Sequence, residues 1–167
     1  MPRSFDVSTE TSASVGEVLT AFGHRDYWLA RLAAYGGESM TLNELEVGTD
    51  GSVAVKTTQD LARGALPGAF ARALPRNLEL VRTESWQPVG DEVRGAVTIA
   101  AHGVPGSGAG TTVLDAVPAG SRLRFTGSLE VRIPLVGGRI EQFIADLIAK
   151  EVPDMQRFTT DWIAEHG

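Results

Sequence analysis

The first part of the chain combines a strand pattern with a helix pattern. Phe5, Val7 and Thr9 alternate with polar residues, which predicts a half-buried strand. Ser14 and Glu17 then have the spacing of a capping box, in which the hydroxyl and the carboxylate satisfy the first free N–H groups of a helix. A helix with an apolar stripe is therefore expected to follow the first strand.

A second short helix is predicted over about 26–35. Trp28, Leu32 and Tyr35 share one face of it, and the glycine at position 36 ends it. An aromatic face of this kind is most often plain core. It could also form one mouth of a ligand pocket, with the Tyr35 phenol orienting the ligand.

The period of hydrophobicity changes to two after the second helix, which indicates a sheet. Six further strands are predicted, at about 39–47, 52–61, 78–87, 92–101, 110–117 and 122–132. Turn residues separate most of them. The connection over 103–110 is rich in glycine and is expected to be a flexible loop.

The registers of the first and last hairpins follow from the pairings that avoid buried charge. In the first, a three-residue loop with Gly51 left-handed sets Glu44 beside Lys56 outside. The residues that it places inside are Leu45, Val47, Val53 and Val55. In the last, Val117 opposite Arg122 sets up three further pairs: Leu114 with Phe125 and Ala116 with Leu123 inside, and Asp115 with Arg124 outside.

The middle hairpin allows two registers. A two-residue loop would bury Arg82 and Glu84, whereas a three-residue loop leaves them outside together with Trp86. Burying unpaired charge is costly, so we favour the three-residue loop. It places on the inner face Val81, Thr83, Ser85, Val97 and Ile99.

The last predicted element is a long helix over about 138–165. Its apolar residues follow helical spacing: Ile140, Phe143, Ile144, Leu147, Ile148, Val152, Met155, Trp162 and Ile163. Pro153 should kink this helix or split it in two. The helix is long enough to cross the whole sheet.

Composition limits the classes of function. The chain of 167 residues is the size of one domain, and we treat 1–167 as a single domain. Its net charge of −6 disfavours nucleic-acid binding, since phosphate contacts need a basic surface. The absence of Cys excludes disulfides and thiolate metal sites. No stretch resembles a signal peptide or a membrane span, so a cytoplasmic location is expected.

The predicted order of elements resembles the START-like, or Bet v 1-like (SRPBCC), helix-grip superfamily. The stretch 131–141, VRIPLVGGRIE, and the stretch 26–32, DYWLARL, resemble an actinobacterial family of unknown function, DUF2505. The resemblance implies an α+β domain with a curved, seven-stranded antiparallel sheet around the long C-terminal helix. It also implies a hollow between sheet and helix, in which relatives hold lipids or other apolar molecules, and in some cases act as cyclases or hydrolases.

The residues expected to line this hollow combine small and apolar side chains on the inner face of the sheet with parts of the helices. They are Trp28, Leu32, Tyr35, Val55, Thr57, Val81, Thr83, Ser85, Val97, Ile99, Phe125, Leu129, Phe143, Leu147 and Met155. The alternative is that Phe143, Leu147 and Met155 fill the space completely.

The segment over 62–76 is long for a connection between two strands. Leu66, Phe70 and Leu74 share a helical face in it, and three arginines give it positive charge. It could act as a lid over the hollow or touch an anionic membrane surface transiently. The simpler interpretation is a surface helix that covers one end of the core.

Catalysis has little support in the sequence. The three His residues match no metal spacing, and His102 beside a loop is the only candidate acid or base among them. The prediction is therefore a binding or carrier protein for an apolar small molecule or lipid, without cofactor or metal. The alternatives are a cyclase- or hydrolase-like enzyme and a protein-interaction module using an exposed Trp86 or the 62–76 segment. The sequence leaves the oligomeric state open.

Overall fold

The computed structural model describes residues 2–60 and 78–166. The elements in chain order are β1 (Arg3–Thr11), α1 (Val15–Phe22), α2 (Arg25–Gly36), the short 3-10 helix η1 (Gly37–Ser39), β2 (Met40–Val47), β3 (Val53–Asp60), β4 (Glu79–Val89), β5 (Glu92–His102), β6 (Gly106–Val117), β7 (Gly120–Val131) and α4 (Gly137–His166). The predicted lid residues Leu66, Phe70 and Leu74 lie outside the described residues, so their role stays a prediction.

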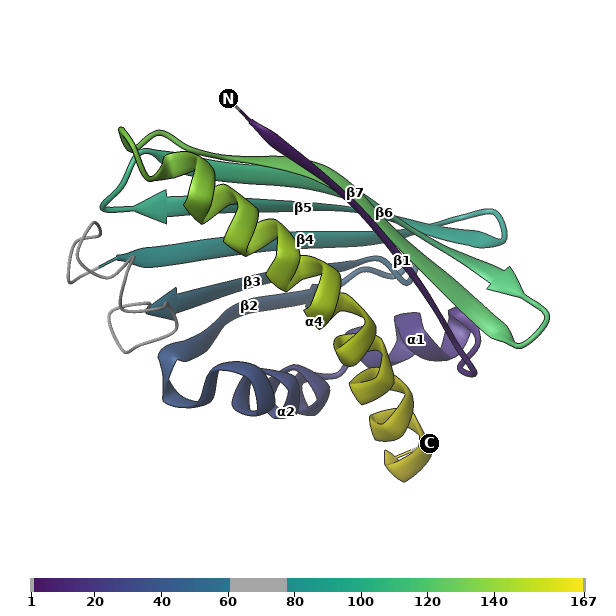
Figure 1. Ribbon diagram of the computed structural model, residues 1–167. Helices are drawn as coiled ribbons and strands as arrows, with labels where there is room; N and C mark the ends of the chain where they lie inside the picture. Colours follow the sequence, from purple (N-terminus) through teal and green to yellow (C-terminus); the bar gives the residue numbers. More distant parts are fainter. Residues whose placement is uncertain (1, 61–77, 167) are drawn as a thin grey trace.

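The seven strands form one antiparallel sheet in the order β1-β7-β6-β5-β4-β3-β2. α4 crosses the concave side of this curved sheet diagonally (Figure 1). It packs on β1 and β7 and meets α1 and α2 toward its C-terminal end. The predicted fold class is confirmed.

Local sequence determines the start of α1 as predicted. The Ser14 hydroxyl accepts from the Glu17 N–H at 3.2 Å, and the Glu17 carboxylate accepts from the Ser14 N–H at 3.0 Å. This capping box satisfies two N–H groups that the first helical turn leaves free.

The first hairpin also has the predicted register. Glu44 pairs with Lys56, and Gly51 is left-handed with φ 87°. Val53 and Val55 are buried, but Val47 at the end of β2 is 54% exposed, which contradicts its predicted inward position. Its place at the end of an edge strand leaves it without a covering layer.

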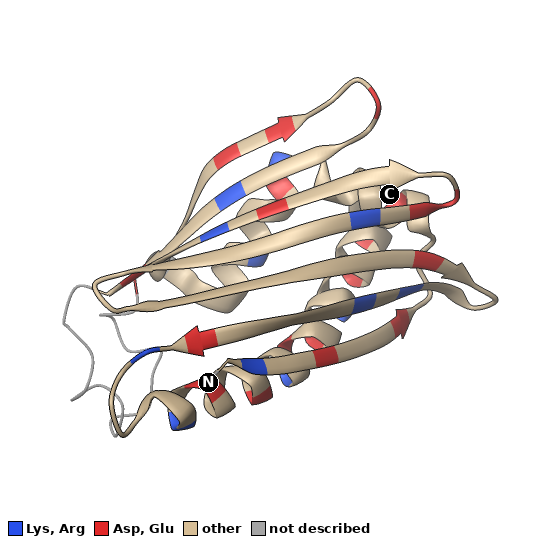
Figure 2. Ribbon diagram, turned by 90° about the horizontal axis from the view of Figure 1, so that it is seen from above, with Lys and Arg blue, Asp and Glu red and all other residues tan. Residues whose placement is uncertain are grey.

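The last hairpin differs from prediction by a shift of two residues. The observed pairs are Val117–Gly120, Ala116–Ser121, Asp115–Arg122 and Leu114–Leu123. An even shift keeps every side chain on its predicted face, because the side-chain period is two. Asp115 therefore forms its ion pair with Arg122 at 2.8 Å, and Arg124 pairs with Asp6 of β1 instead. Charges of both signs are spread along the strands (Figure 2).

The register predicted for the middle hairpin is wrong. Val89 pairs with Glu92, so the loop consists of only Gly90 and Asp91. Gly90 has φ 64°, and glycine is favoured as the first residue of a two-residue type II′ loop. Turn chemistry thus overrides the rule of charge avoidance here.

This odd shift turns β4 over. The residues that it brings to the inner face are Arg82, Glu84 and Trp86, and those that it moves to the outer face are Val81, Thr83 and Ser85. Trp86 is only 3% exposed and Glu84 only 2%. Trp86 is therefore no exposed interaction surface, and three predicted ligand contacts lie on the wrong side of the sheet.

Two further features differ from prediction: the length of the loop between β5 and β6, and the continuity of α4. β6 begins at Gly106, so the expected flexible loop shrinks to residues 103–105. α4 is a single helix across Pro153, which excludes the split, whereas the kink stays a prediction. The buried Glu141 carboxylate of α4 accepts from the Val131 N–H at 2.8 Å and ties the helix to the end of β7.

Aromatic side chains join the helices to the sheet. The Phe22 ring lies 4.8 Å from that of Trp86, 5.6 Å from Tyr27 and 5.7 Å from Trp28. The Trp28 indole N–H donates to the Phe22 carbonyl at 2.6 Å. The hydroxyls of Tyr27 and Thr159 lie 2.5 Å apart and link α2 to α4. Trp28 thus belongs to the core at the C-terminal end of α4.

We predict that Gly127→Ala destabilises the protein by about 1–3 kcal/mol, the usual range for overpacking. A Cβ at Gly127 would lie 2.6 Å from the Gly110 Cα and 2.8 Å from the Phe5 ring. Urea unfolding followed by circular dichroism measures the change.

Gly16→Ala in α1 is the matched control, because a Cβ there meets nothing within 4 Å. We expect it to leave stability unchanged or raise it by about 0.5–1 kcal/mol through helix propensity. Equal stability of the Gly127→Ala variant and the original protein would contradict the close approach of β6 and β7.

Candidate functional site

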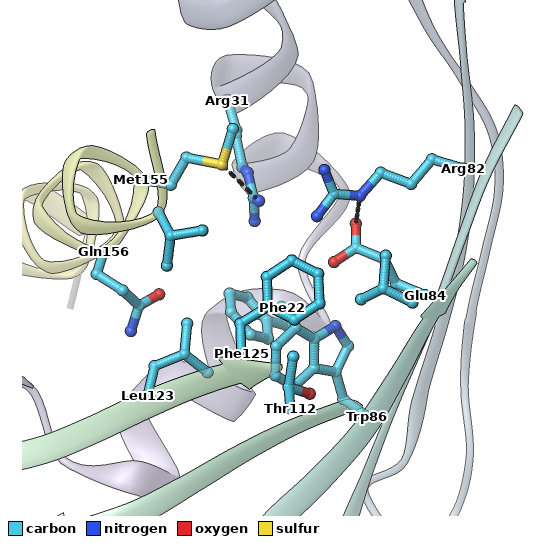
Figure 3. A pocket seen from close by; sticks show the side chains of 12 residues that line it. Phe22, Arg31, Arg82, Glu84, Trp86, Thr112, Leu123, Phe125, Met155 and Gln156 are labelled. Atoms are coloured by element: carbon cyan, nitrogen blue, oxygen red, sulfur yellow. Dashed lines mark hydrogen bonds and ion pairs between the residues drawn. The ribbon is translucent and has the colours of Figure 1, made fainter. Parts of the chain in front are cut away.

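A cavity of about 30 Å³ lies between the inner face of the sheet, α2 and the middle of α4. Its lining combines apolar side chains with several polar and charged ones (Figure 3). The lining residues are Phe22, Arg31, Arg82, Glu84, Trp86, Val97, Thr112, Leu123, Phe125, Val152, Met155 and Gln156. Its volume is close to the share of one water molecule in the liquid.

α2 directs Arg31 into this space. The side chain is buried, at 8% exposure, and its guanidinium lies 4.9 Å from the Trp28 ring. It donates to the Tyr27 hydroxyl at 3.3 Å and to the Met155 sulfur at 3.0 Å. Burial lowers the pKa of Arg31, but the nearby Tyr27 and Glu84 raise it by more, so the guanidinium stays charged.

β4 supplies the second charged pair. Arg82 Nε lies 3.3 Å from Glu84 Oε2, with the Arg82 side chain 28% exposed and that of Glu84 3% exposed. Arg82 Nε has no well-aligned hydrogen-bond acceptor despite this distance, so the contact is mainly electrostatic. In register, Glu84 lies between Val55 of β3 and Val97 of β5, which makes its surroundings apolar apart from the cavity.

Three other polar atoms of the cavity wall lack a hydrogen-bond partner. They are Glu84 Oε1, Trp86 Nε1 and Thr112 Oγ1, and each is shielded from solvent. An unpaired buried polar atom costs about 1–3 kcal/mol. These atoms therefore favour the binding of a polar group in the cavity, either a water molecule or part of a ligand.

Two titratable groups lie near the rim of this cluster. Burial raises the pKa of the Glu151 carboxyl, and the charges of Arg82, Lys150 and Arg31 offset this only in part. Burial also raises the pKa of the Tyr35 phenol. Glu151 is thus a weaker counter-charge for the arginines than an exposed glutamate would be.

The structure brings together only part of the predicted ligand-binding set. The predicted residues that line the cavity are Val97, Phe125 and Met155. Four others lie on the inner face of the sheet but do not line the cavity: Val55, Thr57, Ile99 and Leu129. Five lie in α2 or α4 and do not line it either: Trp28, Leu32, Tyr35, Phe143 and Leu147. His102 is exposed at the end of β5 and does not reach the cavity.

Arg82 and Glu84 were missed because the middle hairpin was placed in the wrong register. Two signals in the sequence point to them. The Gly90-Asp91 pair favours a two-residue loop, and Gly95, opposite Trp86, leaves the space that the indole and Thr112 occupy. Arg31 lies one helical turn after Tyr27 and shares its buried face.

The described part of the chain contains neither a helix that could span a membrane nor a cluster of metal ligands. None of its helices is both long and apolar enough to cross a membrane. Residues 2–60 and 78–166 contain no group of three or more His, Asp or Glu side chains able to hold a metal ion.

Solved structures of other proteins have the same architecture. TTHA0849 from Thermus thermophilus superposes with a TM-score of 0.59 at 16% identity, covering 99% of both chains. An uncharacterized protein of Rhizobium leguminosarum gives 0.58 at 11% identity, covering 96% of both. Ara h 8.0201 gives 0.51 at 9% identity over 99% of both chains. At such low identity these similarities establish the fold alone, which is the Bet v 1-like helix grip.

Sequence comparison gives a closer relationship. Uncharacterized proteins Rv0481c of Mycobacterium tuberculosis and Mb0491c of Mycobacterium bovis are each 38% identical to this chain over 174 aligned positions, covering 99% of both partners. The family model described as "Protein of unknown function (DUF2505)" matches residues 6–163. The chain therefore belongs to the DUF2505 family.

Proposed function

We propose that this protein binds a small molecule with an apolar body and a polar group in the space between α4 and the inner face of the sheet. The observation that carries the proposal is the set of buried polar atoms without partners, Glu84 Oε1, Trp86 Nε1 and Thr112 Oγ1, around a cavity. A helix-grip fold that served only as a scaffold would gain stability from apolar residues at these positions.

The cavity must widen to hold such a ligand. Its volume of about 30 Å³ is far below the roughly 300–1,000 Å³ of usual ligand sites. Two features support widening. α4 packs on β1 and β7 at one edge of the sheet rather than on β4 and β5, and Val152 and Met155, which close the cavity on the helix side, are only half-buried. A modest displacement of α4 then enlarges the space.

The first test is binding itself. Protein purified from its native host is examined by native mass spectrometry, and extracted ligands are identified after denaturation. We expect a bound species in the original protein and its loss in Val97→Phe, because Val97 is 3% exposed and its side chain lines the cavity. Thermal unfolding establishes that the variant is folded.

Thr98→Phe is the matched control, since it adds the same ring to the neighbouring residue on the exposed face of β5. It should retain the ligand. Should Val97→Phe not fold, Val152→Phe fills the same cavity from α4. Absence of any bound species from the original protein, in repeated preparations, would overturn the proposal.

A second prediction concerns the Arg82–Glu84 pair. Glu84→Gln removes the counter-charge of a partly buried arginine, and we expect it to lower the free energy of unfolding by about 1–3 kcal/mol. The 28% exposure of Arg82 keeps the loss below the roughly 3–5 kcal/mol of a fully buried pair, because water screens the remaining charge. Urea denaturation measures it.

The double variant Arg82→Met with Glu84→Met distinguishes function from structure. We expect it to be at least as stable as the original protein, since apolar replacement of a buried pair is often neutral or stabilising, and to lose the ligand. A double variant that is as unstable as Glu84→Gln would indicate that the pair is required by the fold.

A second candidate function, an enzyme on a hydrophobic substrate, is favoured by one observation. Glu84 presents a carboxylate oxygen without a hydrogen-bond partner to a buried cavity, and general acids and bases are often buried carboxyl groups of this kind. The masses of species bound to Glu84→Gln and to the original protein discriminate the two functions. An enzyme accumulates a substrate of different mass in the variant, whereas a binding protein holds the same species or none.

A further inference from the structure

We infer that the ligand carries an acidic head group, such as a carboxylate, that pairs with Arg31 at the α2 side of the cavity. This inference rests on the proposed function and adds the chemical class of the ligand. Figure 3 shows the Arg31 side chain extending from α2, and that of Arg82 from β4, toward the same space.

Arg31 is a buried cation whose described contacts are all uncharged. Its contacts are the Tyr27 hydroxyl, the Met155 sulfur and the Trp28 ring, none of which bears a formal charge. Among the carboxylates whose side chains the structure describes, none lies within salt-bridge distance of the Arg31 guanidinium. Buried charges in proteins are normally paired, and a thioether sulfur is a weak acceptor. The guanidinium therefore retains capacity for a stronger, charged acceptor.

The charges around the cavity leave an excess of positive charge. Among the described residues that line the cavity, Arg31 and Arg82 face one carboxylate, that of Glu84, which lies next to Arg82. The other acid nearby, Glu151, is half-buried and does not line the cavity. A monoanionic head group would balance the remaining charge of Arg31.

The unpaired hydrogen-bonding groups of the cavity wall also favour an acidic head group. The indole N–H of Trp86 is a donor without an acceptor, and Thr112 can donate through its unpaired hydroxyl. Arg82 Nε is a further donor without a well-aligned acceptor, whereas Glu84 Oε1 can only accept and the Thr112 hydroxyl can accept as well as donate. Donors outnumber acceptors, which favours a head group rich in acceptor oxygens.

The test compares ligands that share one alkyl chain and differ only in the head group: dodecanoate, dodecyl phosphate, dodecanol and dodecylammonium. Binding to the full chain is measured by isothermal titration calorimetry and native mass spectrometry. We expect dodecanoate to bind at least about tenfold more tightly than dodecanol, as one charge-assisted hydrogen bond provides. Tighter binding of dodecyl phosphate would support the acidic class and identify phosphate as the head group.

Arg31→Met should weaken dodecanoate binding by about tenfold or more and leave dodecanol binding unchanged. Arg31→Lys retains the charge, and we expect it to restore part of the preference if Arg31→Met does not fold. Arg124→Met, on the outer face and paired with Asp6, is the matched control and should change neither affinity.

The outcomes separate the two proposals. Equal binding of dodecanoate and dodecanol, or tighter binding of dodecylammonium, would overturn the acidic head group and leave the binding function intact. Unchanged dodecanoate affinity in folded Arg31→Met would overturn the role of Arg31. Failure of all four compounds to bind, together with no species bound in protein from the native host, would overturn both proposals.

Discussion

The inner face of β4 is the constraint on which the rest of this structure depends. Because side chains alternate along a strand, the sheet cannot bury Trp86 without also burying Arg82 and Glu84. Burying an indole of about 200 Å² provides about 5 kcal/mol at 25 cal/mol per Å². A buried ion pair costs about 1–4 kcal/mol relative to apolar residues. The aromatic gain is the larger, so the register that hides the indole is favoured even though it buries charge.

The buried indole also determines where the helices lie. Phe22, at the end of α1, packs on Trp86, and Tyr27 and Trp28 pack on Phe22 in turn. These contacts place α2 over the sheet in an orientation that sends Arg31 toward the cavity. A single strand register thus brings together a guanidinium from α2 and a charged pair from β4, which are far apart in the sequence.

The same reasoning shows which features the sequence could predict. The capping box at Ser14 and the left-handed Gly51 depend on neighbouring residues alone, and both were predicted correctly. The even shift in the last hairpin left its faces unchanged, so Leu114, Leu123 and Phe125 were also assigned correctly, whereas Ala116, near the end of β6, is exposed. The middle hairpin failed because charge avoidance was weighed without the burial of Trp86. Trp86 is buried against Phe22, and no pattern in the neighbouring sequence predicts that contact. The inward positions of Arg82 and Glu84 depended on this one choice, whereas Arg31 comes from α2.

The contacts of Arg31 link occupation of the cavity to the position of α4. Its guanidinium holds the Met155 sulfur of α4 directly, and it reaches Thr159 of the same helix through the Tyr27 hydroxyl. A ligand oxygen that pairs with Arg31 would compete with the weak sulfur contact and could replace it at little cost. Release of Met155 removes one of the side chains that close the cavity on the helix side. The group proposed to recognise the head of the ligand would therefore also be one of the groups that close the cavity, which reconciles so small a cavity with the proposed binding.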